Sequence, residues 1–115
     1  MTRIEDIVER IAELQRSDLD AWIHENLVTP REEAGSLLFS DMEYARVRLI
    51  CTLRYELEIE ADTLPVVMSL IDQLYDTRQR LLSLAAAVAS QDKAVQAAIV
   101  SAMAAATSGS TADEP

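Results

Sequence analysis

Hydrophobic residues recur at every seventh position in the second half of the chain, at Val67, Leu74, Leu81, Val88 and Val95. Further apolar residues follow three or four positions later, at Leu70, Ile71, Leu84, Ala85, Ala98 and Ile99. Heptads sustained over four repeats predict a seam between helices, and such a seam can join two subunits. We therefore expect a homodimer whose self-association surface is formed by Val67, Leu70, Ile71, Leu74, Leu81 and Val88.

Polar residues interrupt this pattern at Thr77–Arg78 and at Gln91–Asp92. Ser90 can cap a separate helix, so a helical hairpin competes with one long rod over this region. The segment 85–106 is rich in alanine, which favours helix and permits close packing. Residues 107–115 are small, polar and acidic, and we expect them to form a disordered tail.

The rest of the chain also favours helices over sheets. Its 115 residues contain 2 glycines and 3 prolines, whereas a sandwich or barrel needs many more turn residues. We expect an all-α fold with a small β-hairpin wing. Residues 1–62 would form a winged helix-turn-helix domain, and residues 63–106 a C-terminal helical dimerisation segment.

Two short helices are predicted near the N-terminus. The first is opened by a capping box, Thr2 with Glu5, and the second covers Asp18 to Glu25 with Ser17 as its N-cap. Asn26 suits the left-handed conformation that ends helices. The first helix has an apolar stripe formed by Ile4, Ile7, Val8, Ile11 and Leu14. Two short helices joined by about three residues have the outline of a helix-turn-helix.

The hairpin and a third helix follow. Residues 27–29 and 37–39 are expected to be extended, with a polar turn at 31–35 between them. Ser40 and Glu43 form a second capping box, and Phe39 can pack on Tyr44 as a hydrophobic staple. The third helix is predicted from Asp41 to Leu57. Because this helix is apolar on several sides, we expect it to be central in the core.

The charge balance limits the possible partners. Twenty acidic residues against 10 basic ones give a net charge of −10, which opposes binding to phosphate backbones and to anionic membranes and favours a basic partner. The longest apolar run is too short to cross a bilayer, and the acidic N-terminus does not resemble a secretory signal. We expect a cytoplasmic protein that binds neither nucleic acid nor membrane.

Residues for catalysis or metal binding are scarce. His24 is the only histidine and Cys51 the only cysteine, so a paired-histidine metal site or a Ser-His-Asp relay lacks its components. The two glycines, Gly35 and Gly109, form no phosphate-binding loop. We expect a protein that is not an enzyme and uses no metal or cofactor.

A DNA-reading role requires basic residues on the second helix and the hairpin. The helix from Asp18 to Glu25 has three acidic residues and neither lysine nor arginine, and Arg31 in the hairpin is offset by Glu32 and Glu33. Recognition helices instead place Arg, Lys, Asn or Gln near base edges. This pattern disfavours DNA binding, although the layout is that of a winged helix-turn-helix.

The order of several short segments resembles a known family. They are residues 18–30, which end in Leu-Val-Thr-Pro, Phe39-Ser40-Asp41 followed by Ala45, Arg46 and Leu49, the run Leu53-Arg54-Tyr55-Glu56-Leu57, and Leu64-Pro65 with Leu70-Ile71-Asp72. They resemble MerR-type domains, and more closely the non-DNA-binding chaperone modulator family CbpM. The resemblance covers about residues 4 to 84. The chain has Leu37 where the family often has an aromatic residue, and its alanine-rich extension is longer.

The resemblance implies a protein that binds the J-domain of a DnaJ-like co-chaperone, typically CbpA, and inhibits its activity. A J-domain is expected to present a basic helix, and an acidic surface is its electrostatic complement. The expected partner-binding residues are Asp18, Asp20, Trp22, His24, Glu25, Glu32 and Glu33. Trp22 can instead pack in the core under the wing, and His24 and Glu25 can be plain surface. A MerR-type transcription regulator and a helical scaffold or adaptor dimer remain the alternatives.

Overall fold

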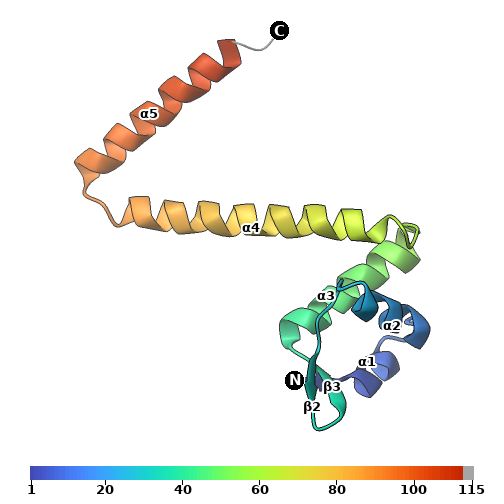
Figure 1. The fold of residues 1–115 in the computed structure, drawn as a ribbon. Helices are drawn as coiled ribbons and strands as arrows, with labels where there is room; N and C mark the ends of the chain where they lie inside the picture. The colour runs from blue at the N-terminus through green and yellow to red at the C-terminus, as the bar shows by residue number, and fades with distance from the viewer. Residues whose placement is uncertain (113–115) are drawn as a thin grey trace. The chain divides into compact units, whose positions relative to one another are not determined.

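The fold is mostly helical. The structure is a computed structural model that describes the backbone of residues 1–112 and the side chains of residues 1–107. Helix accounts for 68% of it, and one small antiparallel sheet has three strands, so the predicted helical fold with a small hairpin is confirmed (Figure 1). The elements are β1 (Thr2–Arg3), α1 (Ile4–Arg10), α2 (Arg16–His24), β2 (Arg31–Glu33), β3 (Ser36–Phe39), α3 (Asp41–Cys51), the π-helical turn η1 (Thr52–Glu56), α4 (Leu64–Ala89) and α5 (Lys93–Ala112).

The chain divides into two compact units, Met1–Asp72, which we call the head, and Gln73–Pro115. The predicted boundary after residue 62 lies ten residues before this division. The reason is that the first turns of α4 belong to the head, where Leu64 and Met68 are completely buried. The first turns of α4 are therefore part of the head, although the same helix continues beyond Asp72.

The first two helices differ from the prediction at their ends. Thr2 does not cap α1, because it pairs with Phe39 in the sheet, and α1 has no side-chain cap. The helix ends at Arg10, although Ile11 in the following turn is still buried. Helix α2 begins at Arg16, so Ser17 is inside the helix and is not its cap. Asn26 has the predicted left-handed conformation, with φ of 61°.

The hairpin is confirmed, but its first strand is displaced from the prediction. Its strands are β2 and β3, and the turn between them consists of Ala34 and Gly35, both with positive φ. Residues 31–33, predicted as part of the turn, thus form a strand, and residues 27–29 precede it. Positive φ at two central residues is typical of the tight turns that match the twist of a hairpin. The third strand, β1, pairs with the other edge of β3. Because β1 has only two residues, its sequence contains no alternating pattern from which a strand could be predicted.

The third helix has one of the two hydrogen bonds of the predicted capping box. The Ser40 hydroxyl accepts a hydrogen bond from the Glu43 backbone N–H at 3.1 Å. The Glu43 carboxylate does not return to Ser40. It instead accepts hydrogen bonds from the backbone N–H and the hydroxyl of Thr29, at 3.1 and 3.0 Å. The Glu43 carboxylate therefore connects the start of α3 to the segment after α2. At its other end, α3 continues at Thr52 into the π-helical turn η1.

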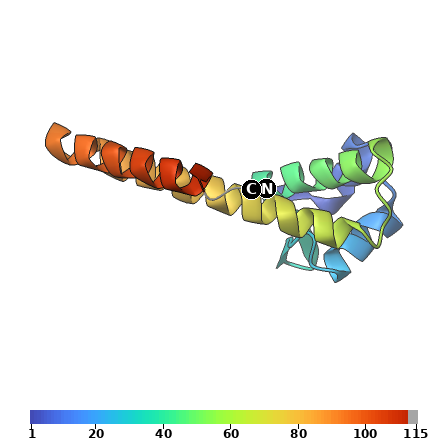
Figure 2. The same ribbon diagram turned by 90° about the horizontal axis from the view of Figure 1, so that it is seen from above.

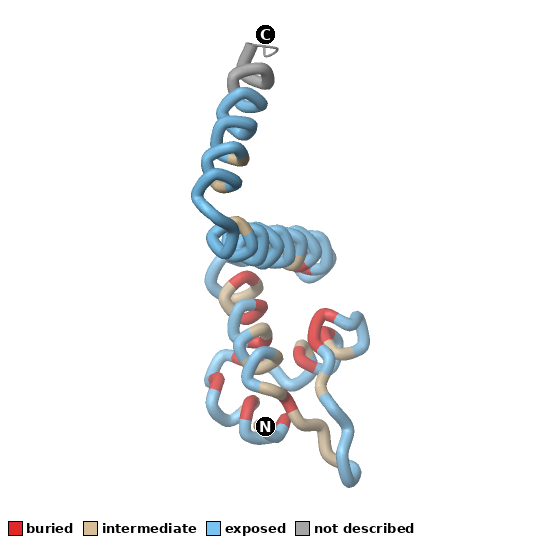
Figure 3. The backbone as a smooth tube through the Cα atoms, turned by 90° about the vertical axis from the view of Figure 1, so that its left-hand side faces the viewer, coloured by how far each residue is buried: buried red, intermediate tan, exposed pale blue. Residues whose placement is uncertain are grey.

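The hydrophobic core lies in the head, where the buried positions are concentrated (Figure 3). Helix α3 contributes Val47, Ile50 and Cys51 to it from one side, whereas Met42 and Leu49 are exposed, so the helix is not apolar toward the core on several sides as predicted. The remaining core residues come from α1, α2, the segments that follow these two helices, β3, η1 and α4: Ile4, Ile7, Ile11, Leu14, Leu19, Trp22, Leu27, Val28, Phe39, Leu53, Leu64 and Met68.

Helix α4 is one unbroken helix of 26 residues (Figure 2). It ends at Ala89, and α5 begins at Lys93, so the single-rod alternative is wrong. The cap of α5 is Asp92, whose carboxylate accepts a hydrogen bond from the Val95 backbone N–H at 2.9 Å, whereas the Ser90 hydroxyl donates back to Ala87. Helix α5 continues to Ala112, into the segment predicted as a tail, and residues 113–115 lie outside the described part of the chain.

Candidate functional site

The acidic surface predicted on the second helix is less acidic than its sequence suggested. Helix α2 starts at Arg16, two residues before the predicted start, and this arginine lies on the same helical face as Asp20. The Arg16 Nε donates to Asp20 Oδ1 at 3.1 Å, an i,i+4 pair with both side chains about half exposed. The prediction of three acids without a base is therefore wrong for this helix.

Asp18 has a structural contact inside the head. Its carboxylate accepts a hydrogen bond of 2.6 Å from the Tyr55 hydroxyl, which in turn accepts one of 3.2 Å from the Gln15 backbone N–H. Tyr55 thus joins η1 to the N-terminus of α2. Burial, and the hydrogen bond to Asp18, raise the pKa of Tyr55 to about 12, so the phenol remains a donor throughout the physiological range. Asp18 is consequently half-buried and oriented toward its own domain.

Trp22 is a core residue. It is 4% exposed, and its ring lies 6.2 Å from the Tyr55 ring, centroid to centroid, at an interplanar angle of 45°. The alternative that placed Trp22 on the surface as a binding anchor is wrong. Residues one turn apart on a short helix share a face, and α2 buries Leu19 and Trp22 together on one side.

The remaining predicted partner-binding residues are exposed. His24 and Glu25 lie at the C-terminal end of α2, and Glu32 and Glu33 lie on β2. Glu33 forms a 3.6 Å ion pair with Arg31, whereas the side chains of His24, Glu25 and Glu32 have no hydrogen bond or ion pair with any described residue. We call Asp20, His24, Glu25, Glu32 and Glu33 the acidic front. No hydrogen bond or ion pair between described side chains links its members on α2 to its members on β2, so we treat the front as two groups on one domain.

An ionic link that the sequence did not suggest joins three segments of the head. The Arg46 guanidinium donates to both carboxylate oxygens of Asp72, at 2.6 and 2.9 Å, and also to the backbone carbonyl of Leu27. The hydrogen bond with Arg46 lowers the pKa of Asp72, and the same contact raises the pKa of Arg46. In the sequence, Arg46 and Asp72 belong to two separate segments of the family resemblance. Their separation of 26 positions gives no local signal for the pair.

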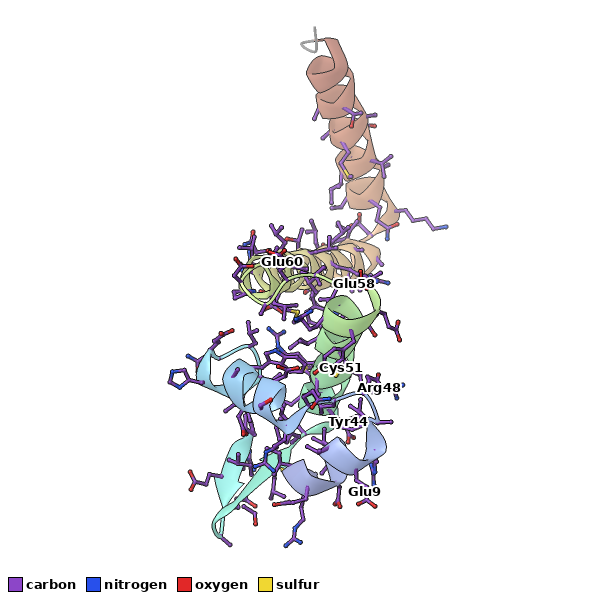
Figure 4. The ribbon with its side chains drawn as sticks, turned by 90° about the vertical axis from the view of Figure 1, so that its right-hand side faces the viewer. Glu9, Tyr44, Arg48, Cys51, Glu58 and Glu60 are labelled. Carbon is purple, nitrogen blue, oxygen red and sulfur yellow. The ribbon has the colours of Figure 1, made fainter. Side chains whose placement is uncertain are left out.

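A hollow of about 210 Å³ lies between α1 and α3. Its lining has both signs of charge, with Arg10 and Arg48 against Glu13 and Glu56, and Figure 4 shows Tyr44, Arg48 and Cys51 along α3. Burial, and secondarily the charge of Glu13, raise the pKa of the Cys51 thiol to about 12. The thiol therefore stays protonated at neutral pH and is not an activated nucleophile.

Among the residues that the structure describes, no three His, Cys, Asp or Glu side chains are grouped so that they could hold a metal ion. Over the same residues, no helix is both long enough and apolar enough to span a membrane.

The predicted self-association residues separate into two sets. Val67 and Ile71 pack against the core of the head, so they are not available to a second helix as predicted. Leu70, Leu74 and Leu81 are exposed, and Val88 is half-buried. The heptad pattern could not make this distinction, because Leu70 and Ile71, which follow Val67 by three and four residues, point about 100° apart around the helix axis.

Comparison of the chain with protein-family models, with curated proteins and with solved structures found no match.

Proposed function

We propose that this protein is a chaperone modulator similar to the CbpM family. In this role it binds the J-domain of a DnaJ- or CbpA-like co-chaperone in the cytoplasm and inhibits the co-chaperone by covering the surface that its chaperone partner needs. It acts by binding and not by catalysis, and needs no cofactor. The supporting observation is the acidic front, where the side chains of Glu25 and Glu32 are exposed and have no hydrogen bond or ion pair with any described residue.

The charge of the head supports a basic partner. Its residues 1–72 contain 16 acidic and seven basic residues, a net charge of −9, and four acidic members of the front lie on its surface. Complementary charge increases the rate of encounter more than it increases the lifetime of a complex. A basic helix such as that of a J-domain would therefore be attracted before any close contact forms. With Trp22 in the core, the front has no large aromatic anchor, so we expect a complex of moderate affinity that depends strongly on salt.

The MerR-type alternative is less well supported by the same surface. The exposed ends of α2 and β2 have carboxylates where a DNA-reading protein needs cations, and Arg16 and Arg31 are paired with Asp20 and Glu33. Each carboxylate near a phosphate backbone opposes binding. We expect no binding to duplex DNA at about 150 mM salt, measured by fluorescence anisotropy. Binding there would favour the regulator.

The test of the proposal is a charge reversal with a matched control. The front variant changes Glu25, Glu32 and Glu33 to lysine. The control changes Glu58, Glu60 and Asp62 to lysine, three exposed residues in the turn before α4, two of which are labelled in Figure 4. Both triples change the net charge equally. Exposed charges contribute about 0.2–1 kcal/mol each, so we expect the front variant to lose about tenfold in affinity.

Association with a purified J-domain, measured by surface plasmon resonance at about 50 and 300 mM salt, distinguishes the outcomes. The front variant should associate more slowly and lose most of the salt dependence, whereas the control should remain close to wild type. Equal effects of the two triples would show that only the overall charge matters. The absence of any J-domain binding by the wild type would refute the proposed function and leave the helical scaffold as the alternative.

A further inference from the structure

The hollow between α1 and α3 is a separate feature of the head. All of its lining residues belong to the unit Met1–Asp72, and none of them belongs to the acidic front. Its charged lining residues are Arg10 at the end of α1, Glu13 just after that helix, Arg48 on α3 and Glu56 on η1. The proposed binding of a J-domain therefore gives this cavity no role.

The charged side chains of the hollow are not paired with one another. Two arginines and two glutamates line the same cavity, yet their side chains have no hydrogen bond or ion pair with any described residue. By contrast, Arg16, Arg31 and Arg46 of the same head each form an ion pair with a carboxylate. The charges of the hollow are therefore available to a ligand that itself has charges of both signs.

The uncharged residues of the hollow differ in polarity. Ile11 and Cys51 are buried and form a neutral, apolar part of the lining. Burial raises the pKa of the Cys51 thiol most strongly, the charge of Glu13 raises it further and the charge of Arg48 lowers it, so charges of both signs act on this one group. The Tyr44 hydroxyl has no hydrogen bond with any described residue and can bind a polar group of a ligand.

The size and the charge of the hollow limit the ligand. Its volume of about 210 Å³ has room for about seven water molecules at roughly 30 Å³ each, and is smaller than the pockets that hold drug-sized ligands. Because charges of both signs line it in equal number, a ligand with a net charge would leave one sign without a partner. A small zwitterion satisfies both signs, since a guanidinium donates paired hydrogen bonds to a carboxylate and an ammonium group donates to glutamate oxygens.

We propose that the hollow between α1 and α3 binds a zwitterionic amino acid with a small polar side chain. Arg10 and Arg48 bind its carboxylate, and Glu13 and Glu56 bind its ammonium group. The Tyr44 hydroxyl binds its polar side chain. This inference goes beyond the J-domain proposal and is independent of it, because the two concern different residues and different ligands.

The test uses L-serine and two compounds that each lack one of its charges. L-serine has about as many non-hydrogen atoms as the hollow has room for water molecules. 3-Hydroxypropanoate is serine without its amino group, and 2-aminoethanol is serine without its carboxylate. Each compound is titrated into the ¹⁵N-labelled full chain up to about 50 mM, and the backbone amide shifts are recorded by NMR. We expect saturable shifts at the residues that line the hollow for L-serine alone, with a Kd of about 1 mM.

Two pairs of substitutions test the residues. The hollow variant is Arg10→Gln with Arg48→Gln, and the control is Arg78→Gln with Arg80→Gln, two exposed positions on α4 that give the same change in charge. The hollow variant should raise the Kd for L-serine about tenfold or more, whereas the control should leave it unchanged. Because neither guanidinium of the hollow has a described partner, the head should remain folded, and the fluorescence of the buried Trp22 should not change.

Several results would overturn the proposal. The absence of saturable shifts with L-serine would do so, as would saturable shifts confined to residues outside the hollow. Equal binding of 3-hydroxypropanoate or of 2-aminoethanol would show that the site takes a single charge and not a zwitterion. Equal effects of the two pairs of substitutions would show that only the overall charge of the chain matters. None of these results changes what the J-domain assay measures, so the two proposals fail separately.

Discussion

The strongest test of the core assignment is the replacement of Trp22 by alanine, which removes the largest side chain of α2 from the head. The ring is 4% exposed and lies against the Tyr55 ring, so its removal leaves a cavity between α2 and η1. Replacing a buried aromatic residue by alanine costs about 3–5 kcal/mol. We expect the substitution to destabilise the head by an amount in this range.

The size of the head makes this loss severe. A unit of about 70 residues has a free energy of unfolding of roughly 4–11 kcal/mol, since folded proteins gain about 0.05–0.15 kcal/mol per residue. The alanine variant would thus lose about half of its stability. For a domain of this size, about 1 kcal/mol lowers the Tm by 4–8 °C, so a decrease of more than about 12 °C is expected. Trp22→Phe retains an aromatic ring and should cost much less.

Thermal and urea unfolding, followed by circular dichroism, measure these changes without requiring a tryptophan signal. The decisive comparison is made at a temperature at which Trp22→Ala is still folded. There, we expect its affinity for a J-domain to match that of the wild type, because the ring does not reach the surface. An unchanged Tm combined with lost binding would refute the burial argument and would make Trp22 an anchor.

Two further predictions concern contacts inside the head. Replacing Asp72 by asparagine should cost about 0.5–1.5 kcal/mol at pH 7, because one charged partner of Arg46 is lost and the pair is only partly buried. Since Arg46 lowers the pKa of Asp72, the stabilisation is complete above the unfolded-state pKa of about 3.9 and is lost as the pH falls through the folded-state pKa. Urea titrations of both proteins from pH 7 to pH 2.5 should therefore converge at the acid end, and a constant difference would contradict the assignment. Cys51, whose pKa is raised to about 12, should react with a thiol reagent at pH 8 only after unfolding, and rapid labelling of the native protein would show that the site is open.

Several features of the fold follow from the sequence because they are local. The shortage of glycine and proline predicts a helical chain, Ser40 predicts the start of α3, and Asn26 predicts the end of α2. Each of these features depends on residues within four positions of one another. The interactions that produce them are backbone conformational preferences and helix capping. The interruption at Gln91–Asp92 was equally visible, although the cap proved to be Asp92 and not Ser90.

The acidic front was predicted only in part. The exposure of Glu25 and Glu32 follows from their positions at a helix end and in a hairpin. The roles of Trp22 and Asp18 do not follow, because both depend on Tyr55, which is more than 30 positions away in the sequence and approaches α2 only when η1 packs against it. Tyr55 lies in one of the segments that resemble the CbpM family, and no residue of that segment indicates that Tyr55 contacts Asp18 and Trp22.

By itself, the sequence determined the helical character of this protein, its strongly acidic N-terminal half and the seven-residue repeat of its second half. Tertiary structure decided which side of each helix is used. It assigned Val67 and Ile71 to the core and left Leu70 and Leu74 exposed, although all four fit one heptad pattern. It also paired Thr2 with Phe39 in place of the predicted cap, and Arg46 with Asp72. The physical reason is that periodicity fixes the directions in which side chains leave a helix, whereas the surface that each direction meets depends on where distant segments pack.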